Sequence, residues 1–192
     1  MTRILAFAGS LRKDSWNKKL LQEALRLAPE SIQFTLLDLK DHPLPLYDAD
    51  FEAEHGMPEN AIELRRLMTE HQGLLIASPE YNGGMTGVLK NTLDWMSRKH
   101  GDQRGLDPFM HKPAAVVSAS PGPYGGARSV QSAVLLLNRL GCLVLPDGVS
   151  VTHCETAFDA EGHLQGKDQK SLQRVVQALG GVALKMGQKA EG

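Results

Sequence analysis

Three stretches of the chain combine polar side chains with glycines, and each follows an apolar run. In the first, residues 9–17, hydroxyl, amide and guanidinium groups precede a helical pattern; the candidate residues are Ser10, Leu11, Arg12, Ser15 and Asn17. An arginine fork matches phosphate oxygens, and a helix start offers free N–H groups at the positive end of its dipole. This stretch therefore predicts a site for a phosphomonoester. The alternative is that Ser15 or Asn17 caps the helix and that Arg12 is solvated.

The second stretch is a turn, residues 79–84, after the apolar run 74–77. Its candidate residues are Pro79, Glu80, Tyr81, Asn82, Gly83 and Gly84. Asn82 and the glycines readily take positive φ values, which turn backbone N–H groups inward. Such groups suit the carbonyl and ring-nitrogen edge of a heterocycle, with Tyr81 against its face or rim. The alternative is a tight turn with an exposed tyrosine.

The third stretch, residues 118–128, is rich in glycine and proline. Its candidate residues are Ser118, Ser120, Gly122, Gly125 and Gly126. Glycines allow a backbone to approach a ligand closely, and a helical pattern that begins near Gly126 adds free N–H donors. The alternative is a turn that only reverses the chain. For Arg128 the two alternatives are a residue of the site and a solvated arginine at the start of that helix, and the second is the prediction.

The first stretch excludes two common nucleotide sites. It lacks the G-x-x-x-x-G-K-[ST] pattern of nucleoside-triphosphate loops and the G-x-G-x-x-G pattern of dinucleotide folds. Asp38 stands where a ribose-binding acid of a dinucleotide fold would stand, but the glycines are missing. A phosphate site that has neither pattern indicates that the ligand is a mononucleotide.

Strand and helix patterns alternate along the chain and position these stretches. Strands are predicted at 3–8, 32–38, 73–77 and 114–118, with short pieces at 142–145 and 149–151. Helices are predicted at 17–28, 59–71, 86–99, 127–140 and 168–186. Five strands separated by helices predict an α/β fold, a doubly wound parallel sheet between two helical layers, in one domain spanning residues 1–192. The three polar stretches then meet at the carboxyl edge of the sheet, where such folds bind ligands.

Composition limits the class of protein. The 192 residues carry a net charge of −1, which offers no field to attract nucleic acid or an anionic membrane. No apolar run approaches the ~18 residues of a membrane span, and the N-terminus lacks a secretory pattern. Cys142 and Cys154 form no C-x-x-C pair, and the seven histidines show no metal spacing. We expect a cytoplasmic protein with no metal site, and we assign no catalytic acid or base.

Taken together and in order, the motifs resemble the NAD(P)H-dependent FMN reductase family, which includes quinone, chromate and azo-dye reductases. The resemblance rests on Gly9-Ser10-Leu11-Arg12 with Ser15 and Asn17, on Pro79-Glu80-Tyr81-Asn82-Gly83, and on Leu89-Lys90-Asn91 with Asp94-Trp95. It covers the chain from the first strand to the helix at 127–140. One departure is Gly84-Met85-Thr86, where many relatives have a small polar residue, an aliphatic residue and a proline. This departure changes the rim of the expected site.

The resemblance implies a flavodoxin-like fold with strand order 2-1-3-4-5 and tightly bound FMN. By position, the first stretch holds the FMN phosphate, the second borders the isoalloxazine ring, and the third closes its other side. NADPH or NADH then binds transiently as electron donor, and a small acceptor such as a quinone or free flavin takes the electrons in a ping-pong cycle. Family members form dimers or dimers of dimers through the helix at 86–99, which places Lys90, Asn91, Asp94 and Arg98 near a second subunit.

Two other classes of protein remain open at this stage. One is a flavodoxin-type electron carrier without NAD(P)H oxidation of its own, although such carriers are usually strongly acidic and this chain is nearly neutral. The other is a flavin-free α/β domain whose loops are only turns. For the four polar residues of the helix at 86–99, the alternative to a subunit contact is a solvated helix face.

Overall fold

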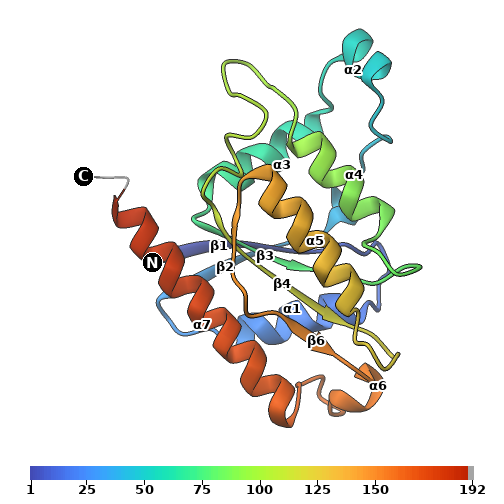
Figure 1. Ribbon diagram of the computed structural model, residues 1–192, viewed down its shortest axis with the longest axis vertical. Helices are drawn as coiled ribbons and strands as arrows, with labels where there is room; N and C mark the ends of the chain where they lie inside the picture. The colour runs from blue at the N-terminus through green and yellow to red at the C-terminus, as the bar shows by residue number, and fades with distance from the viewer. Residues whose placement is uncertain (190–192) are drawn as a thin grey trace.

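The computed structural model describes residues 1–189 and shows one parallel sheet between two layers of helices (Figure 1). The strands are β1 (Thr2–Ala8), β2 (Ile32–Leu37), β3 (Gly73–Ala77), β4 (Pro113–Ala119), β5 (Leu143–Val144) and β6 (Val149–Val151). Their order is β2-β1-β3-β4-β5, and β6 also pairs with β4. The two short pieces therefore share the fifth position of the sheet. The order 2-1-3-4-5 that the family resemblance implies is confirmed.

Helices cover both faces of this sheet (Figure 1). The longer ones are α1 (Trp16–Arg26), α3 (Glu59–Glu70), α4 (Gly87–Met96), α5 (Ala127–Leu140) and α7 (Gly166–Lys189). Neighbouring residues of a strand point to opposite faces, so β1 places Ile4 and Ala6 in the core beneath α1 and α7. The same strand places Leu5 and Phe7 in the core beneath α3, α4 and α5. All four side chains are fully buried, which explains why this strand shows no alternation of apolar and polar residues.

Three short helical pieces lie within connections, where the sequence predicts none. They are η1 (Leu39–Asp41), α2 (Ala49–His55) and α6 (Cys154–Ala157). α2 projects from the body of the molecule (Figure 1) and buries none of its residues, so it has no apolar face for periodicity to detect. The Asp48 carboxylate caps α2 by accepting from the backbone N–H groups of Asp50 and Phe51.

The connection from β2 to α3 is fastened to α4. Asn91 Oδ1 accepts from the backbone N–H of Tyr47 at 2.8 Å, and Asn91 Nδ2 donates to the carbonyl of Pro45 at 2.8 Å. Trp95 Nε1 donates to the same carbonyl at 2.8 Å. Two residues of α4 therefore hold a segment of their own chain.

The connection from α4 to β4 is fastened by a buried arginine on α3. Arg65 Nη1 donates to the carbonyls of Met96 at 2.6 Å and Gly105 at 2.9 Å, and Nη2 donates to the carbonyl of Arg104 at 3.2 Å. Within residues 1–189 this guanidinium forms no ion pair, and its burial lowers the pKa of Arg65. Carbonyl dipoles replace part of the water that the charge has lost, and the same bonds fasten the loop to α3.

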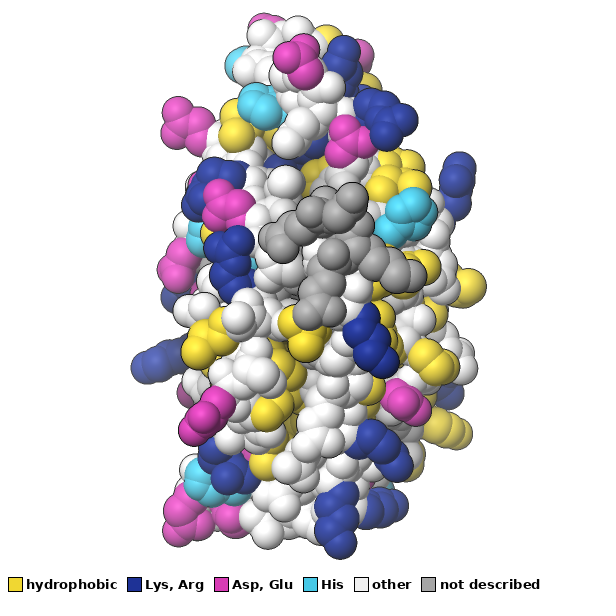
Figure 2. Space-filling model, turned by 90° about the vertical axis from the view of Figure 1, so that its left-hand side faces the viewer, with side chains coloured by type: hydrophobic (Ala, Val, Ile, Leu, Met, Phe, Trp, Pro, Cys, Tyr) yellow, Lys and Arg dark blue, Asp and Glu magenta, His cyan; other side chains and the backbone are white. Residues whose placement is uncertain are grey.

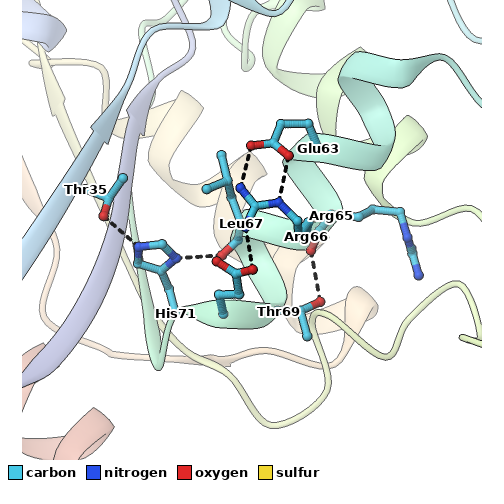
Figure 3. A network of polar contacts seen from close by, with 8 residues as sticks. Thr35, Glu63, Arg65, Arg66, Leu67, Thr69 and His71 are labelled. Carbon is cyan, nitrogen blue, oxygen red and sulfur yellow. Dashed lines mark hydrogen bonds and ion pairs between the residues drawn. The ribbon is translucent and has the colours of Figure 1, made fainter.

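A second buried polar network joins the end of α3 to β2 (Figure 3). His71 follows α3; its Nδ1 lies 2.6 Å from the carbonyl oxygen of Leu67, and its Nε2 lies 2.7 Å from Thr35 Oγ1. A carbonyl oxygen can only accept, so Nδ1 carries a proton. Burial lowers the pKa of His71, which favours the neutral ring, in which Nε2 accepts from the threonine hydroxyl.

Basic and acidic side chains are interspersed over the face shown in Figure 2. Among residues 1–189, no helix has the length and apolar character needed to cross a bilayer. The same residues hold no group of three or more His, Cys, Asp or Glu arranged for a metal ion. Cys142 and Cys154 are both buried free thiols.

Candidate functional site

The three polar stretches meet beyond the carboxyl ends of β1, β3 and β4. They line a hollow of about 190 Å³ whose walls are Ser10, Arg12, Ser15, Trp16, Asn17, Pro79, Glu80, Tyr81, Ala119, Ser120 and Pro121. Parallel strands all end at one edge, so segments far apart in the chain share one site. The candidate residues outside this lining are Leu11, Asn82, Gly83, Gly84, Ser118, Gly122, Gly125 and Gly126.

The first stretch offers polar groups that its own chain leaves without partners. Ser15 occupies the N-cap position of α1, but its side chain makes no capping hydrogen bond. Ser10 Oγ accepts from the backbone N–H of Arg12 at 3.3 Å, which orders the loop. The Arg12 guanidinium forms no hydrogen bond or ion pair with the described residues. Leu11 is half exposed and faces a separate small hollow.

Asn17 connects the first stretch to the third. Its Nδ2 donates to the carbonyl of Ala119 at 2.9 Å, and its Oδ1 accepts from the backbone N–H of Ala119 at 3.1 Å. Asn17 is almost fully buried. Its amide therefore serves chiefly to join the two loops, and it forms no cap on α1.

The second stretch closes into a tight turn. The backbone N–H of Tyr81 donates to the carbonyl of Gly84 at 3.0 Å, and the N–H of Gly84 donates to the carbonyl of Tyr81 at 3.1 Å. Asn82 and Gly83 have φ values of 52° and 79°, the left-handed conformation that the sequence predicts here. Their backbone N–H groups make no hydrogen bond within residues 1–189. Tyr81 stands at the rim with 52% of its surface exposed.

Glu80 pairs with Arg128, a contact that sequence reasoning missed. Arg128 Nη1 donates to Glu80 Oε1 at 3.0 Å, and the backbone N–H of Arg128 donates to Glu80 Oε2 at 3.1 Å. The guanidinium also lies 4.3 Å from the ring centroid of Tyr124. The prediction of a merely solvated arginine is therefore wrong, because this side chain joins the second stretch to the third. The partners are 48 residues apart, so no local pattern indicates the pair.

The glycines of the third stretch allow close packing rather than lining the hollow. A Cβ on Gly126, where φ is 86°, would lie 1.9 Å from Ser118 Oγ. A Cβ on Gly125 would lie 2.7 Å from the carbonyl oxygen of Ser150. Ser118 is fully buried, and its hydroxyl has no hydrogen-bond partner in the described chain. The N–H of Gly122 donates to Ser120 Oγ at 3.3 Å, so Gly122 shapes the loop that presents the serine.

Further side-chain hydrogen bonds complete the connections between the three stretches. Thr86 Oγ1, at the N-cap of α4, donates to the carbonyl of Gly9 at 2.7 Å. Ser129 Oγ donates to the carbonyl of Pro79 at 2.8 Å. With the Asn17 bonds, each stretch is joined to the other two, so the edge is organised before any ligand arrives. Thr86 stands where the family pattern often has proline, and its hydroxyl makes the first of these bonds.

The comparison with known families decides the assignment. The family described as NADPH-dependent FMN reductase matches residues 2–156 of the chain. The chain belongs to the NADPH-dependent FMN reductase family. It is 37% identical over 181 residues to the NAD(P)H-dependent FMN reductase of Pseudomonas aeruginosa, a match that covers 92% of each protein.

Two further relatives support the assignment of this chain to the FMN reductase family. A 2-hydroxy-1,4-benzoquinone reductase from a Burkholderia species is 35% identical over 170 residues, which cover 88% of each protein. The solved structure of the flavoenzyme NAD(P)H:(acceptor) oxidoreductase from Paracoccus denitrificans matches with a TM-score of 0.81 and 32% identity, over 96% of this chain and 98% of that one. The predicted family and the flavodoxin-like α/β fold are confirmed.

The residues present fit the family's cofactor. Arg12 and the Ser15 hydroxyl have no hydrogen-bond partners within residues 1–189, and both line a hollow at the N-terminus of α1, a donor set that suits the phosphate of FMN. The hollow, at about 190 Å³, is smaller than the roughly 300 Å³ at which typical ligand pockets begin. Its size therefore suits the phosphate and sugar-alcohol part of FMN rather than the whole cofactor.

Two larger hollows lie elsewhere and do not share this chemistry. One, of about 320 Å³, is lined by residues such as Thr69 and Lys112 near the amino edge of the sheet. The other, of about 370 Å³, lies between α1 and residues 160–163. Neither gathers the loops that follow the strands, so size alone does not locate the FMN site.

Proposed function

We propose that this chain is an FMN-dependent NAD(P)H oxidoreductase, acting as one domain of residues 1–192, that passes electrons to a quinone, free flavin or similar small acceptor. The observation that carries the proposal is the convergence of three loops on one hollow. Its wall contains the Arg12 guanidinium and the Ser15 hydroxyl, which have no partners in the described part of the chain. Membership of the FMN reductase family, with relatives named as quinone reductases at 34% identity, supports it.

FMN, when bound, accepts a hydride from the reduced nicotinamide and returns the electrons to an acceptor. The chain's own part is to bind and to orient. Arg12, Ser15 and the start of α1 hold the phosphate end. The backbone N–H groups of Asn82 and Gly83 are the donors available for the polar edge of the ring. Because the loops are already joined to one another, little reorganisation is needed at the moment of reaction.

The site is open to solvent, which favours a cycle in which one face of the flavin ring serves both substrates in turn. Tyr81, which lines the hollow, is 52% exposed, and Tyr124, which lies against Arg128 next to Glu80, is 60% exposed. Exposed aromatic side chains near the site suit first a nicotinamide and then an aromatic acceptor. This arrangement supports a ping-pong cycle. We assign no catalytic acid or base, and no metal.

The proposal includes a homodimer or homotetramer that uses α4 and the connection fastened to it. Lys90 and Asp94 pair with each other at 2.7 Å, and Arg98 pairs with Glu52 at 2.9 Å, so these charges are satisfied within one chain. Leu46, on the fastened connection, is 82% exposed. Changing Leu46→Glu should lower the mass measured by light scattering if this surface joins subunits. An unchanged mass would place the subunit contact elsewhere.

The cytoplasm is the compartment that suits this chemistry. Two buried free thiols fit a reducing environment, and the cytoplasm supplies reduced nicotinamides. The proposed partners are small molecules, with neither nucleic acid nor a membrane among them.

The absorption spectrum of the purified protein tests the function. Flavin bands that bleach without oxygen on addition of NADPH or NADH, and return on addition of a quinone, are the expected result. Bands that persist with both donors would mean an electron carrier such as a flavodoxin. A colourless protein that takes up no added FMN would mean a flavin-free domain.

A further inference from the structure

Arg128 lies next to Glu80, a wall residue of the candidate site, and contacts both the second and the third stretch. Its aliphatic stem lies against the turn of the second stretch, since a Cβ on Gly83 would be 3.7 Å from Arg128 Cδ. Its guanidinium lies between the Glu80 carboxylate, at 3.0 Å, and the ring of Tyr124, at 4.3 Å. These contacts hold the side chain in one place although half of it is exposed.

Most of the guanidinium remains available to a ligand. Of its several N–H donors, only one on Nη1 has a partner among residues 1–189, the Glu80 carboxylate. The fork presents its remaining donors to solvent in a plane suited to phosphate oxygens. The stacked Tyr124, 60% exposed, adds an aromatic surface beside them.

The two arginines of this edge have different neighbours and so suit different anions. Arg12 lines the hollow at the N-terminus of α1, where the FMN phosphate fits. Arg128 is absent from that lining but pairs with Glu80, which belongs to it, and half of the Arg128 side chain is exposed. Of the substrates in the proposed reaction, the nicotinamide donor always carries phosphates, whereas a simple quinone carries none.

We propose that Arg128 docks a phosphate of the reduced nicotinamide donor, with Tyr124 holding the guanidinium in position. This inference rests on the proposed function and assigns one of its substrates to a named residue. Glu80 keeps the side chain in place while the site is free, and the more highly charged phosphate then competes with it for the same fork. The phosphate is either the pyrophosphate common to NADPH and NADH or the 2′-phosphate that only NADPH carries.

The test compares the FMN-loaded wild type with Arg128→Met and Arg128→Lys. In a ping-pong cycle kcat/KM for the donor and kcat/KM for the acceptor are independent, because the donor has left before the acceptor binds. Arg128→Met should lower kcat/KM for the donor by about 10- to 100-fold, the loss expected for a hydrogen bond to a charged group. It should leave kcat/KM for an uncharged quinone unchanged. Arg128→Lys, which keeps the charge, should recover part of the loss.

The same experiment distinguishes the pyrophosphate from the 2′-phosphate. A loss confined to NADPH, with weaker binding of adenosine 2′,5′-bisphosphate measured by calorimetry, identifies the 2′-phosphate. An equal loss with NADPH and NADH, with weaker binding of adenosine 5′-diphosphate, identifies the pyrophosphate.

Arg66→Met is the matched control. Arg66 pairs with Glu63 on α3, and its side chain is 52% exposed against 50% for Arg128. This control should change neither kcat/KM. Equal losses for donor and quinone in Arg128→Met would reveal a structural role and overturn the inference, as would no loss at all. A wild type that oxidises neither donor contradicts the proposed function instead, and the two nucleotide-binding measurements still test Arg128 directly.

Discussion

The side-chain amide of Asn17 binds both backbone polar groups of Ala119, with hydrogen bonds of 2.9 and 3.1 Å. Asn17 lies in the first turn of α1 and Ala119 ends β4, so this one side chain fixes the first stretch against the third. An asparagine is the natural choice, because its amide both donates and accepts.

Asn17→Ala should destabilise the protein by about 2–4 kcal/mol, because it leaves a buried N–H and a buried carbonyl without partners. FMN binding should weaken as well, since both loops line the hollow. The measurements are urea unfolding and FMN titration. Asn60→Ala is the control: Asn60 also donates to a backbone carbonyl, that of Pro43, but at an exposed site. It should cost about 1 kcal/mol or less, and equal costs for the two variants would contradict the assigned role of Asn17.

Arg12→Ala should weaken FMN binding by on the order of 1.5–3 kcal/mol, the value of a hydrogen bond to a charged group. Stability without FMN should stay the same, because the Arg12 guanidinium has no partner in the described chain. Fluorescence titration with FMN gives the affinity, and the neighbouring Lys13→Ala provides the control. An FMN affinity that does not change in Arg12→Ala would remove Arg12 from the phosphate site.

Much of the carboxyl edge of the sheet can be predicted, because its strands and turns are indicated by short stretches of sequence. Apolar runs buried on both faces mark β1, β3 and β4, and Asn82-Gly83 indicates its own positive φ values. The bonds between loops have no such signal. Thr86 and Gly9 are 77 residues apart, and Glu80 and Arg128 are 48 apart. Only the fold brings these partners together, so the sequence predicts which loops meet but not which atoms join them.

Helix α2 is a local element that the sequence nevertheless does not predict. Its seven residues bury no side chain, so neither helical nor strand periodicity appears in them. The available signal was Asp48, whose carboxylate caps the helix, but a single acid in a connection containing several acids is weak.

Gly126→Ala should lower the stability of the protein by more than the strain of its positive φ value accounts for. At φ 86° any side chain is strained, and here the added Cβ would also lie 1.9 Å from Ser118 Oγ. Gly162 separates the two effects, since its φ is 84° and an added Cβ there would meet nothing within 4 Å. Gly162→Ala should cost about 1–2 kcal/mol, and Gly126→Ala clearly more in the same urea unfolding assay. Similar costs would show that the contact with Ser118 is unimportant.

Ser118→Ala tests the same contact from the other side. The Ser118 hydroxyl is buried without a partner, so its removal should leave stability unchanged or slightly higher. FMN affinity should also stay the same, because Ser118 does not line the hollow. A marked loss of FMN affinity would return Ser118 to the cofactor-binding residues.

His71 should make the protein less stable as the pH falls from 7 to 5. Burial is the main cause that lowers the pKa of His71, and it outweighs the hydrogen bond to the Leu67 carbonyl, which raises that pKa. The positive charges of Arg3 and Lys112 lower it further, against a smaller opposite effect of Glu70. The folded ring thus stays neutral at a pH where the unfolded ring, with its ordinary pKa of about 6.5, has already bound a proton. The unfolded state binds more protons, so stability falls as the pH drops through that value, by at most about 1.4 kcal/mol for each pH unit.

Urea unfolding at pH 7, 6 and 5 measures this effect, with His71→Gln as the comparison. The variant should be less stable at pH 7, because it loses the contacts to Leu67 and Thr35. Because glutamine cannot titrate, the variant should lose less stability than the wild type between pH 7 and 5. Parallel pH profiles for the two proteins would show that other groups, and not the buried ring drawn in Figure 3, govern the acid sensitivity.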